Sequence, residues 1–310
     1  MIKNALLTGG TGLTGNALLR YLLDKDVNVT VLVRNNSTRL ANLPDDPRMR
    51  IVFCDINEYP LIDKKINDVD YDVFFHLAWD GSLGTQKVNN RFNVPLQLGN
   101  LNCFIEAIEL CNRIGCKKFI ATGSQAEYGT VKHIIDENTP LRPTTAYGAA
   151  KVCSSNMGRI LCEQYGIKFI WARLFSVYGP FDGAMSLVDT SIRELINNNK
   201  SIPYTSGEQQ WNYIYSYDAA KALRLLADMD LDSDTFCIAS ASGRKLKEYI
   251  EIIHSVVCPA IKPAIGEKES TSNVELDVDI TKLVRATGFT EDYTFEEGIK
   301  IIADQFKRNV

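Results

Sequence analysis

Two side chains four positions apart, Tyr147 and Lys151, form the pair in this sequence best suited to proton transfer. On a helix they would share one face, which places an ammonium beside a phenol. A free tyrosine has a pKa of about 10 and is a poor acid or base near neutrality. A neighbouring cation favours the phenolate, so the spacing predicts a tyrosine that exchanges protons near working pH. The same spacing occurs on many helices by chance, and its meaning depends on the rest of the chain.

A glycine-rich segment near the N-terminus predicts a nucleotide-binding turn. An apolar run at 4–8 precedes Gly9-Gly10-Thr11-Gly12-Leu13-Thr14-Gly15, and residues 16–23 have helical periodicity. Glycines at these spacings permit a tight turn, let a pyrophosphate approach the backbone and seat the helix on the strand. The unpaired N–H groups at the helix start favour an anion. We therefore expect a dinucleotide to contact Gly9, Thr11, Gly12, Leu13, Thr14 and Gly15.

The end of the second predicted strand, residues 27–33, indicates which dinucleotide binds. An acidic residue there would bond the ribose 2′-hydroxyl of NAD, but the chain continues with Arg34, followed by Asn35, Ser37, Thr38 and Arg39. Cations and hydroxyls suit a 2′-phosphate, which favours NADP(H) over NAD(H). The alternative is that Arg34 and Arg39 are solvated loop charges, and NAD(H) then remains the cofactor.

Further strands alternate with helices along the chain. Apolar runs predict strands at 50–54, 72–78, 117–122, 168–174 and 235–239, with a mainly helical segment at 89–115 and a terminal helix at 295–306. This order predicts an α/β fold, a doubly wound parallel sheet with helices on both faces. We expect a dinucleotide-binding domain at 1–175, to which 235–258 returns, and a smaller, interrupted substrate lobe at 176–310.

Ligands of such sheets lie at the carboxyl ends of the strands. This places Asp55 and Ile56 at the adenine, and Leu77, Ala78 and Leu174 along the cofactor. Trp79, Ser124 and Gln125 follow two of these strands and are predicted substrate contacts; the family resemblance described below implies Ser176 and Trp211 as further substrate contacts. His76 lies inside an apolar strand, where a packed core histidine is the more common outcome. Thr144 or Thr145 could cap the helix that carries Tyr147.

Composition excludes several classes of function. The net charge of -4 is spread without blocks, which argues against a nucleic-acid surface. No apolar stretch approaches a membrane span, and the N-terminus lacks the pattern of a secretory signal, so we expect a cytoplasmic protein. The eight cysteines form no Cys-x-x-Cys and are accompanied by only three histidines. We expect reduced core cysteines and no metal site.

Four motifs in this order resemble the extended short-chain dehydrogenase/reductase family of nucleotide-sugar epimerases, dehydratases and reductases. They are the glycine turn 8–15 with His76-Leu77-Ala78, Ser124 four residues before Tyr128-Gly129, the Tyr147 and Lys151 pair, and Arg173-Leu-Phe-Ser-Val-Tyr-Gly-Pro180. The resemblance spans nearly the whole chain. Segments 123–129 and 207–213 look most like the CDP-4-keto-6-deoxyhexose reductases that make abequose or paratose.

The resemblance implies roles for three residues. Tyr147 would protonate the C4 oxygen of a sugar, or deprotonate it in reverse. Lys151 would hold the nicotinamide ribose and lower the tyrosine pKa, and Ser124 would bond the same sugar oxygen. It also implies a nucleotide-sugar substrate and a homodimer formed through segments 89–115 and 145–165.

Departures from the family pattern narrow the reaction. Family dehydratases carry an Asp-Glu pair directly after the serine or threonine, but Gln125 and Ala126 cannot transfer protons, which makes dehydration improbable. Ser176 stands where many relatives have asparagine, and Trp211 where many have an arginine toward the diphosphate. The indole of Trp211 could stack on a base or serve as packing.

Two catalytic readings and one non-catalytic reading remain. The Arg34 segment favours an NADPH-dependent 4-ketoreductase of a nucleotide-activated, CDP-linked 6-deoxyhexose in deoxysugar biosynthesis. The alternative is a 4-epimerase, which keeps one NAD and uses the same serine, tyrosine and lysine. A dinucleotide-sensing regulator without turnover is the remote third possibility, because such proteins usually lose the tyrosine and lysine.

Overall fold

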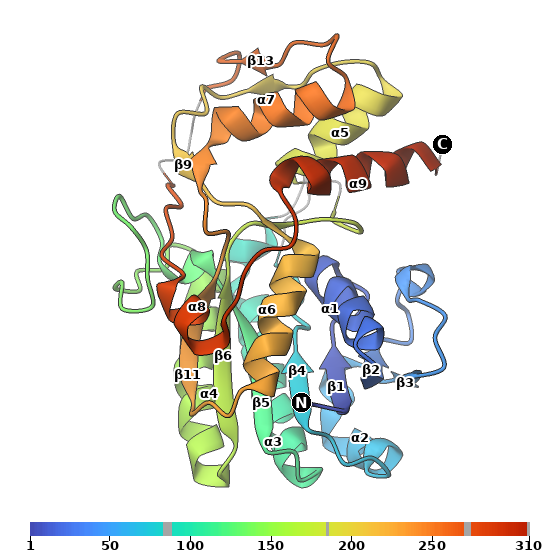
Figure 1. Cartoon of the computed structure of the whole chain (residues 1–310). Helices are drawn as coiled ribbons and strands as arrows, with labels where there is room; N and C mark the ends of the chain where they lie inside the picture. The colour runs from blue at the N-terminus through green and yellow to red at the C-terminus, as the bar shows by residue number, and fades with distance from the viewer. Residues whose placement is uncertain (83–88, 184–185, 270–273, 309–310) are drawn as a thin grey trace.

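A seven-stranded parallel sheet forms the centre of the molecule and confirms the predicted doubly wound α/β fold (Figure 1). The computed structural model describes residues 1–82, 89–183, 186–269 and 274–308. In spatial order the strands are β11 (Asp234–Ile238), β6 (Lys168–Leu174), β5 (Lys118–Ser124), β4 (Val73–His76), β1 (Asn4–Thr8), β2 (Asn28–Val33) and β3 (Met49–Phe53). The chain leaves β1 toward β3 and later returns to start β4 on the other side, which creates a crevice at the carboxyl end of β1.

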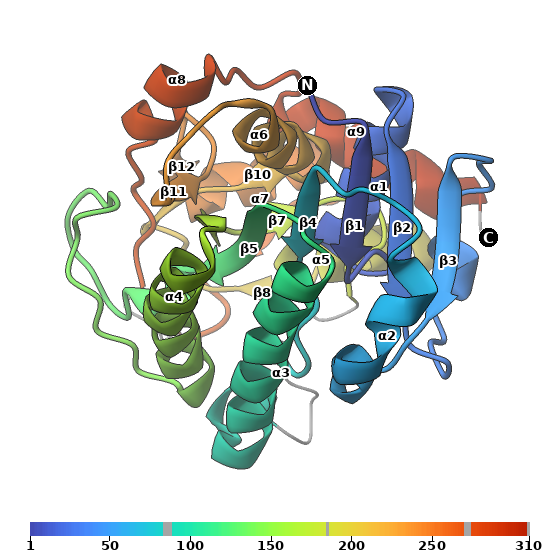
Figure 2. The same ribbon diagram turned by 90° about the horizontal axis from the view of Figure 1, so that it is seen from below.

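Helices cover both faces of this sheet (Figure 2). On one face lie α1 (Leu13–Asp24) and α6 (Ser216–Asp228), and on the other α2 (Tyr59–Ile66), α3 (Val94–Arg113) and α4 (Ala146–Tyr165). Alternation along β1 explains the two layers, because Leu7 belongs to the core beneath α1 and Leu6 to the core beneath α3. The strands that are buried on both faces of the sheet have nearly continuous apolar sequences.

Local capping fixes where the two long helices start. Thr145 accepts a hydrogen bond from the backbone N–H of Gly148, as predicted for the helix of Tyr147. The segment 89–115 is not one helix, because a short 3₁₀ turn at Asn90–Phe92 precedes α3. The side chain of Asn93 caps α3 and Pro95 follows in its first turn, so the α-helix begins at Val94.

Three of the remaining helices form a smaller lobe above the carboxyl end of the sheet (Figure 1). There α5 (Leu187–Asn197), α7 (Leu246–Val257) and α9 (Phe295–Arg308) pack around aromatic side chains that include Tyr178, Tyr249 and Phe295. The shorter elements are η1 (Leu40–Asn42), η2 (Ile56–Glu58), η3 (Asn90–Phe92), η4 (Gln125–Glu127), β7 (Val177–Tyr178), β8 (Pro203–Tyr204), β9 (Gln210–Trp211), β10 (Ile214–Tyr215), β12 (Arg244–Lys245), β13 (Ala264–Ile265) and α8 (Thr281–Thr287).

Three parts of the chain lie elsewhere than the predicted domain limits suggest. The strand β11 returns to the sheet beside β6, but α7 packs against α5 and α9, so only the first part of 235–258 returns. Conversely, α6 and α8 belong to the predicted lobe in sequence, yet α6 packs on α1 and α8 packs on β11. For α6, the physical reason is that the apolar face of α1 needs a second helix to cover it on that side of the sheet.

The cysteines are free, and five of them are buried as predicted: Cys54, Cys111, Cys116, Cys162 and Cys237. Cys103, Cys153 and Cys258 are half-exposed, so the prediction of a core position was wrong for these three. Among the described residues no helix combines the length and apolar character that a bilayer crossing needs. Nor do their His, Cys, Asp and Glu side chains gather into a group that could hold a metal ion.

Asp218 gives the fold a predictable pH dependence. It is fully buried at the start of α6, where Oδ1 accepts a hydrogen bond from the N–H of Asp292 and Oδ2 has no partner. Burial raises the pKa of this carboxyl to about 6. The folded protein therefore binds the proton more tightly than the unfolded chain does, and stability falls as pH rises from about 4 to 6.

We expect the Asp218→Asn variant to lose this dependence. Its unfolding free energy relative to wild type should rise by about 1–2 kcal/mol between pH 4 and pH 7.5. Urea unfolding of both proteins across that range measures the difference. A constant difference at all pH values would contradict the assignment, whatever its sign.

Candidate active site

A cavity of about 690 Å³ at the carboxyl end of the sheet brings together nearly all of the predicted site residues. Its lining includes Gly9, Thr11, Gly12, Leu13, Thr14, Gly15, Arg34, Asp55, Ile56, Leu77, Ala78, Trp79, Ser124, Gln125, Tyr147, Lys151, Leu174 and Ser176. Their individual roles stay predictions. Trp211 is not among the lining residues; it packs in the apolar clusters of the lobe, and Tyr213 lines the cavity instead.

The glycine turn has the geometry that a phosphate needs. Gly9 adopts φ 78°, and a Cβ on it would lie 2.8 Å from the carbonyl carbon of Leu77. A Cβ on Gly15 would overlap the carbonyl oxygen of Gly9, so strand and helix approach closely only without side chains. Gly12 caps α1 without a side-chain bond, and no acidic residue lies in the first turn. The helix N–H groups therefore remain available to a pyrophosphate.

Residues at the end of β2 and β3 line the far end of the cavity. Arg34, Ser37, Thr38 and Arg39 all lie there, and the lining between 34 and 39 holds no carboxylate. Asp55 uses its carboxylate locally, because Oδ1 accepts the N–H of Ile56 in a capping box with Glu58. The residues present thus fit a dinucleotide, with the glycine turn at its phosphates and this end at its adenosine.

Two elements, β5 and α4, position the predicted catalytic residues. Ser124 is the last residue of β5, Tyr147 lies in the first turn of α4, and Lys151 follows one turn later. The hydroxyls of Ser124 and Tyr147 are hydrogen-bonded to each other. Lys151 donates from Nζ to the carbonyl oxygen of Thr122 at 2.7 Å. Both Tyr147 and Lys151 are buried, at 8% and 4% exposed, so their charges are sensitive to their neighbours.

The predicted effect of Lys151 on the tyrosine is not what the structure shows. Burial raises the pKa of the Tyr147 phenol, and the opposing influences are the Ser124 hydrogen bond and the positive charge of Arg91. The Lys151 ammonium points to Thr122 and lies 5.9 Å from the centre of the Tyr147 ring. Burial in turn lowers the pKa of Lys151 to about 7. Four-residue spacing puts the two side chains on one face but does not fix where the ammonium ends.

Trp79 provides the closest aromatic contact of this lysine. The Lys151 Nζ lies 3.7 Å from the centre of the Trp79 ring, whose edge meets Tyr147. The indole N–H is bonded to Oε1 of Gln97 at 2.8 Å, which fixes the ring. An ammonium over an indole face is stabilised by the ring quadrupole, so Trp79 opposes the loss of the lysine proton.

We expect the Trp79→Leu variant to lose activity at lower pH than wild type. Removing the ring should lower the pKa of Lys151 further, and the alkaline limb of kcat/KM should shift down by about 0.5–1 pH unit. A pH–rate profile of both proteins measures this shift. A uniform loss of activity without a shift would instead indicate a substrate contact or a packing role for Trp79.

A buried ion pair supports Ser124 from behind. Glu127 is fully buried and pairs with Nε of Arg173 at 2.8 Å. The same carboxylate accepts the backbone N–H of Ser124 at 2.7 Å and the indole N–H of Trp171. Glu127 therefore points away from the cavity and is not available for proton transfer to a ligand.

Gln125 and Ser176 are hydrogen-bonded to each other at the lobe side of the cavity. Oε1 of Gln125 accepts the N–H of Ser176 at 3.0 Å and its hydroxyl at 3.2 Å. This leaves the amide nitrogen of Gln125 with its two N–H donors for a ligand. Neither residue is an acid, and Ala126 follows, so the serine has no proton-transferring neighbour in the chain.

Sequence reasoning missed several residues that line the cavity, among them Arg91, Asp182 and Tyr213. No motif marks them, because they lie in connections whose positions depend on the tertiary fold. His76 is a core residue as predicted: it is 3% exposed, bonds the Thr8 hydroxyl, and burial lowers its pKa to about 3.

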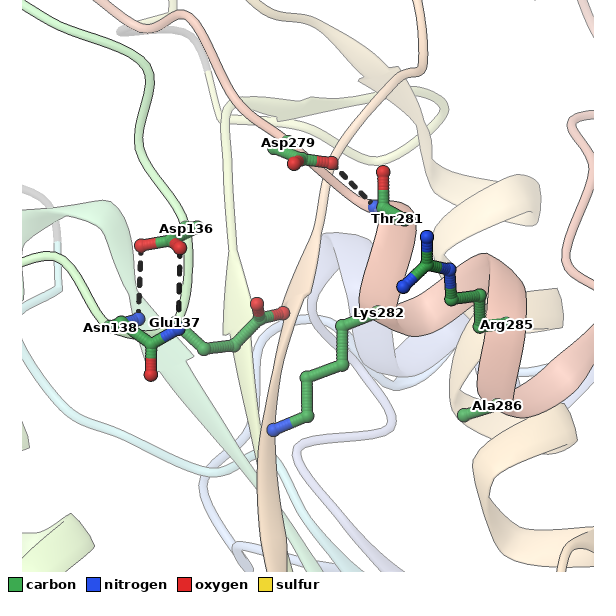
Figure 3. Close-up of a pocket in the computed structure, with 8 residues that line it drawn as sticks. All are labelled: Asp136, Glu137, Asn138, Asp279, Thr281, Lys282, Arg285 and Ala286. Carbon is green, nitrogen blue, oxygen red and sulfur yellow. Dashed lines mark hydrogen bonds between the residues drawn. The ribbon is translucent and has the colours of Figure 1, made fainter.

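A second hollow of about 490 Å³ lies between the segment 136–138 and α8 (Figure 3). Its carboxylates are already bonded within their own turns, Asp136 to the N–H of Asn138 and Asp279 to the N–H of Thr281. Lys282 pairs with Asp234. Because these two carboxylates and Lys282 already have partners, we assign no reaction to this hollow.

The sheet, the glycine turn on α1 and the Ser124, Tyr147 and Lys151 side chains at one strand edge define a dinucleotide-binding protein of the short-chain dehydrogenase/reductase class. The chain belongs to the NAD dependent epimerase/dehydratase family, whose sequence model matches residues 5–239.

Similar proteins cover nearly the whole chain. A Methanocaldococcus jannaschii protein provisionally named a UDP-glucose 4-epimerase is 26% identical, with 98% of each chain covered. The dTDP-glucose 4,6-dehydratase 1 of Escherichia coli is 22% identical over 98% of this chain and 92% of its own. The structure of a UDP-N-acetylglucosamine 4-epimerase from Methanobrevibacter ruminantium superposes with a TM-score of 0.88 at 24% identity, covering 99% of both chains. That likeness shows the fold alone. No CDP-4-keto-6-deoxyhexose reductase is among these three proteins, so the closer resemblance stays a prediction.

Proposed function

We propose that this protein is an NAD-dependent 4-epimerase of a nucleotide sugar. The observation that carries the proposal is the hydrogen-bonded pair of Ser124 and Tyr147 hydroxyls in the cavity, next to a Gln125 and Ala126 that cannot supply the acid of a dehydratase. The Methanocaldococcus jannaschii relative provisionally named a 4-epimerase matches over 98% of each chain, which supports this reaction over the reductase favoured by Arg34.

The chain's own groups would do the following. Tyr147 takes the proton of the sugar C4 hydroxyl and returns it to the C4 oxygen, and Ser124 donates a hydrogen bond to that oxygen. Lys151 would hold the ribose of the cofactor, while its ammonium is bonded to the carbonyl oxygen of Thr122. When bound, NAD would supply the hydride acceptor and donor for C4. Burial of Tyr147 and Lys151 excludes water from the reacting groups.

A second candidate is an NADPH-dependent 4-ketoreductase acting on a CDP-linked 6-deoxyhexose in deoxysugar biosynthesis. It is favoured by Arg34, Ser37, Thr38 and Arg39, which line the adenosine end of the cavity without a carboxylate. The two arginines would bind a 2′-phosphate of NADP. Both side chains are exposed, so they would also leave room for the 2′-hydroxyl of NAD.

The deciding experiment identifies the cofactor and the reaction together. Purified protein is denatured, any released nicotinamide is identified by mass, and the native protein is given UDP-glucose, UDP-N-acetylglucosamine or a 4-keto-6-deoxy nucleotide sugar with NADPH. Retained NAD and appearance of the C4 epimer by NMR are expected. If the protein instead binds NADPH exchangeably and oxidises it only when the keto sugar is present, the proposed epimerase is wrong and the protein is the reductase.

We also propose that the protein is a homodimer through α3 and α4. These helices pack side by side, and they and the turn before α3 expose apolar side chains: Phe92 at 59%, Val94 and Leu98 at 54%, Met157 at 47% and Ile160 at 49%. Such a stripe on two adjacent helices suits a second copy of the chain.

We expect the Leu98→Glu and Ile160→Glu double variant to be monomeric, because two carboxylates would be buried at the interface. Light scattering after size exclusion measures the mass. The control is Leu61→Glu, on a 77% exposed residue of α2 outside the stripe, which should keep the wild-type mass. A monomeric wild type would refute the dimer.

A further inference from the structure

Arg91 lies in the cavity and against the predicted catalytic tyrosine. Its guanidinium carbon is 5.0 Å from the centre of the Tyr147 ring, and its side chain lines the cavity. Nε is buried without a partner, and no described residue forms an ion pair or side-chain hydrogen bond with this guanidinium. A buried, unpaired donor of this kind costs free energy unless a ligand supplies the acceptor.

The segment that carries Arg91 is held firmly. Gln97 of α3 is 1% exposed, and its amide nitrogen donates to the carbonyl oxygens of Asn90 at 3.0 Å and Gly81 at 3.3 Å. Its Oε1 accepts the indole N–H of Trp79. The position of Arg91 over Tyr147 is therefore set by the scaffold and does not depend on the guanidinium finding a partner of its own.

The other cations among the described lining residues lie away from the place where a substrate would meet Ser124 and Tyr147, or already have a partner. Arg34 and Arg39 follow β2 at the adenosine end, and Lys151 is bonded to Thr122 and covered by Trp79. On the lobe side, the described lining offers Ser176, Val177, Phe181, Asp182, Gly183, Ser186 and Tyr213, none of which is cationic. Arg91 is thus the one cation of the described lining that is left for a ligand bound at Ser124 and Tyr147.

We propose that Arg91 binds an anionic group of the substrate and so determines which substrates enter. This inference rests on the proposed function and adds the chemistry of recognition. The planar guanidinium presents paired N–H donors that match phosphate and carboxylate oxygens. Two parts of a nucleotide sugar carry such oxygens, the diphosphate and the carboxylate of a uronic acid, and the test separates them.

The test measures binding of UDP, UDP-glucose and UDP-glucuronic acid by calorimetry, using the protein as purified with its cofactor. The variants are Arg91→Gln, which removes the charge, and Arg91→Lys, which keeps the charge but loses the paired donors. Arg285→Gln, on the exposed face of α8 (Figure 3), is the matched control and should bind as wild type does. Thermal unfolding of each variant verifies that it is folded.

The pattern of losses identifies the anion. If Arg91 binds the diphosphate, Arg91→Gln weakens all three ligands by about 10- to 100-fold, and Arg91→Lys weakens them less. If it binds a sugar carboxylate, only UDP-glucuronic acid is weakened and the wild type prefers it. Equal affinities of wild type and Arg91→Gln for all three ligands would overturn the Arg91 assignment and leave the epimerase standing. A wild type that binds none of them would overturn both.

Discussion

The Tyr147→Phe variant should lose turnover by about 10²–10⁴-fold while keeping its cofactor, because it removes only the phenolic oxygen that exchanges the proton. The ring that packs against Trp79 and beneath Arg91 is retained, so the cavity keeps its shape. The hydrogen bond between the Ser124 hydroxyl and the phenol oxygen disappears, and no other described proton-transferring side chain contacts that serine hydroxyl. Initial rates give the turnover, and quenching of protein fluorescence gives the cofactor affinity.

The same substitution elsewhere on α4 provides the control. Tyr165 lies near the end of this helix, outside the cavity, and its hydroxyl donates to Glu109. Tyr165→Phe should leave both turnover and cofactor affinity within about twofold of wild type, as surface changes usually do. Wild-type turnover in Tyr147→Phe would remove the tyrosine from the mechanism and revive the reading of a dinucleotide-sensing regulator.

The Glu127→Gln variant should lose about 3–5 kcal/mol of unfolding free energy, because Arg173 would remain buried without its counter-ion. Both oxygens of Glu127 accept hydrogen bonds, from Ser124 and Trp171 on one and from Arg173 and Trp171 on the other. An amide of the same shape has one oxygen, so its NH₂ group must face a donor. Urea unfolding measures the loss.

A second substitution separates charge from packing at this position. Adding Arg173→Met to Glu127→Gln removes the unpaired cation and should restore part of the lost stability. Turnover should fall in both variants, because the N–H of Ser124 loses its fixed acceptor and the serine hydroxyl is no longer held in place. A stability loss below about 1 kcal/mol in Glu127→Gln would contradict the assigned role of the ion pair.

Local rules explain which parts of this molecule were predictable. The glycine turn requires a positive φ at Gly9 and a close backbone approach at Gly15. Only glycine permits both, so the residue types alone predict the turn. The start of α4 at Thr145 and the shared face of Tyr147 and Lys151 follow from capping and helical periodicity. The parallel sheet was predicted from apolar runs that alternate with helical segments along the chain.

Features that depend on tertiary contacts were not predictable in this way. The pKa of Tyr147 is raised because the folded chain buries it, and the charge that opposes this comes from Arg91, which is distant in sequence. The lysine ammonium was expected at the phenol and instead meets Thr122 and Trp79. The packing of α6 on α1 joins segments about two hundred residues apart, and Trp211 lies in the lobe core because its neighbours there are apolar.

Two adjacent residues of α3 face opposite sides of the helix. Gln97 points inward and ties the segment of Trp79 and Arg91 in place, while the adjacent Leu98 points outward into the apolar stripe. Because the helix moves as one rigid body, a shift that a neighbouring subunit imposed on Leu98 would also move Gln97. Through its hydrogen bonds, Gln97 would then move Trp79 and the segment of Arg91, which line the cavity. In the proposed dimer, self-association would thus affect the alignment of the reacting groups, and the specific activity of the enzyme would depend on protein concentration.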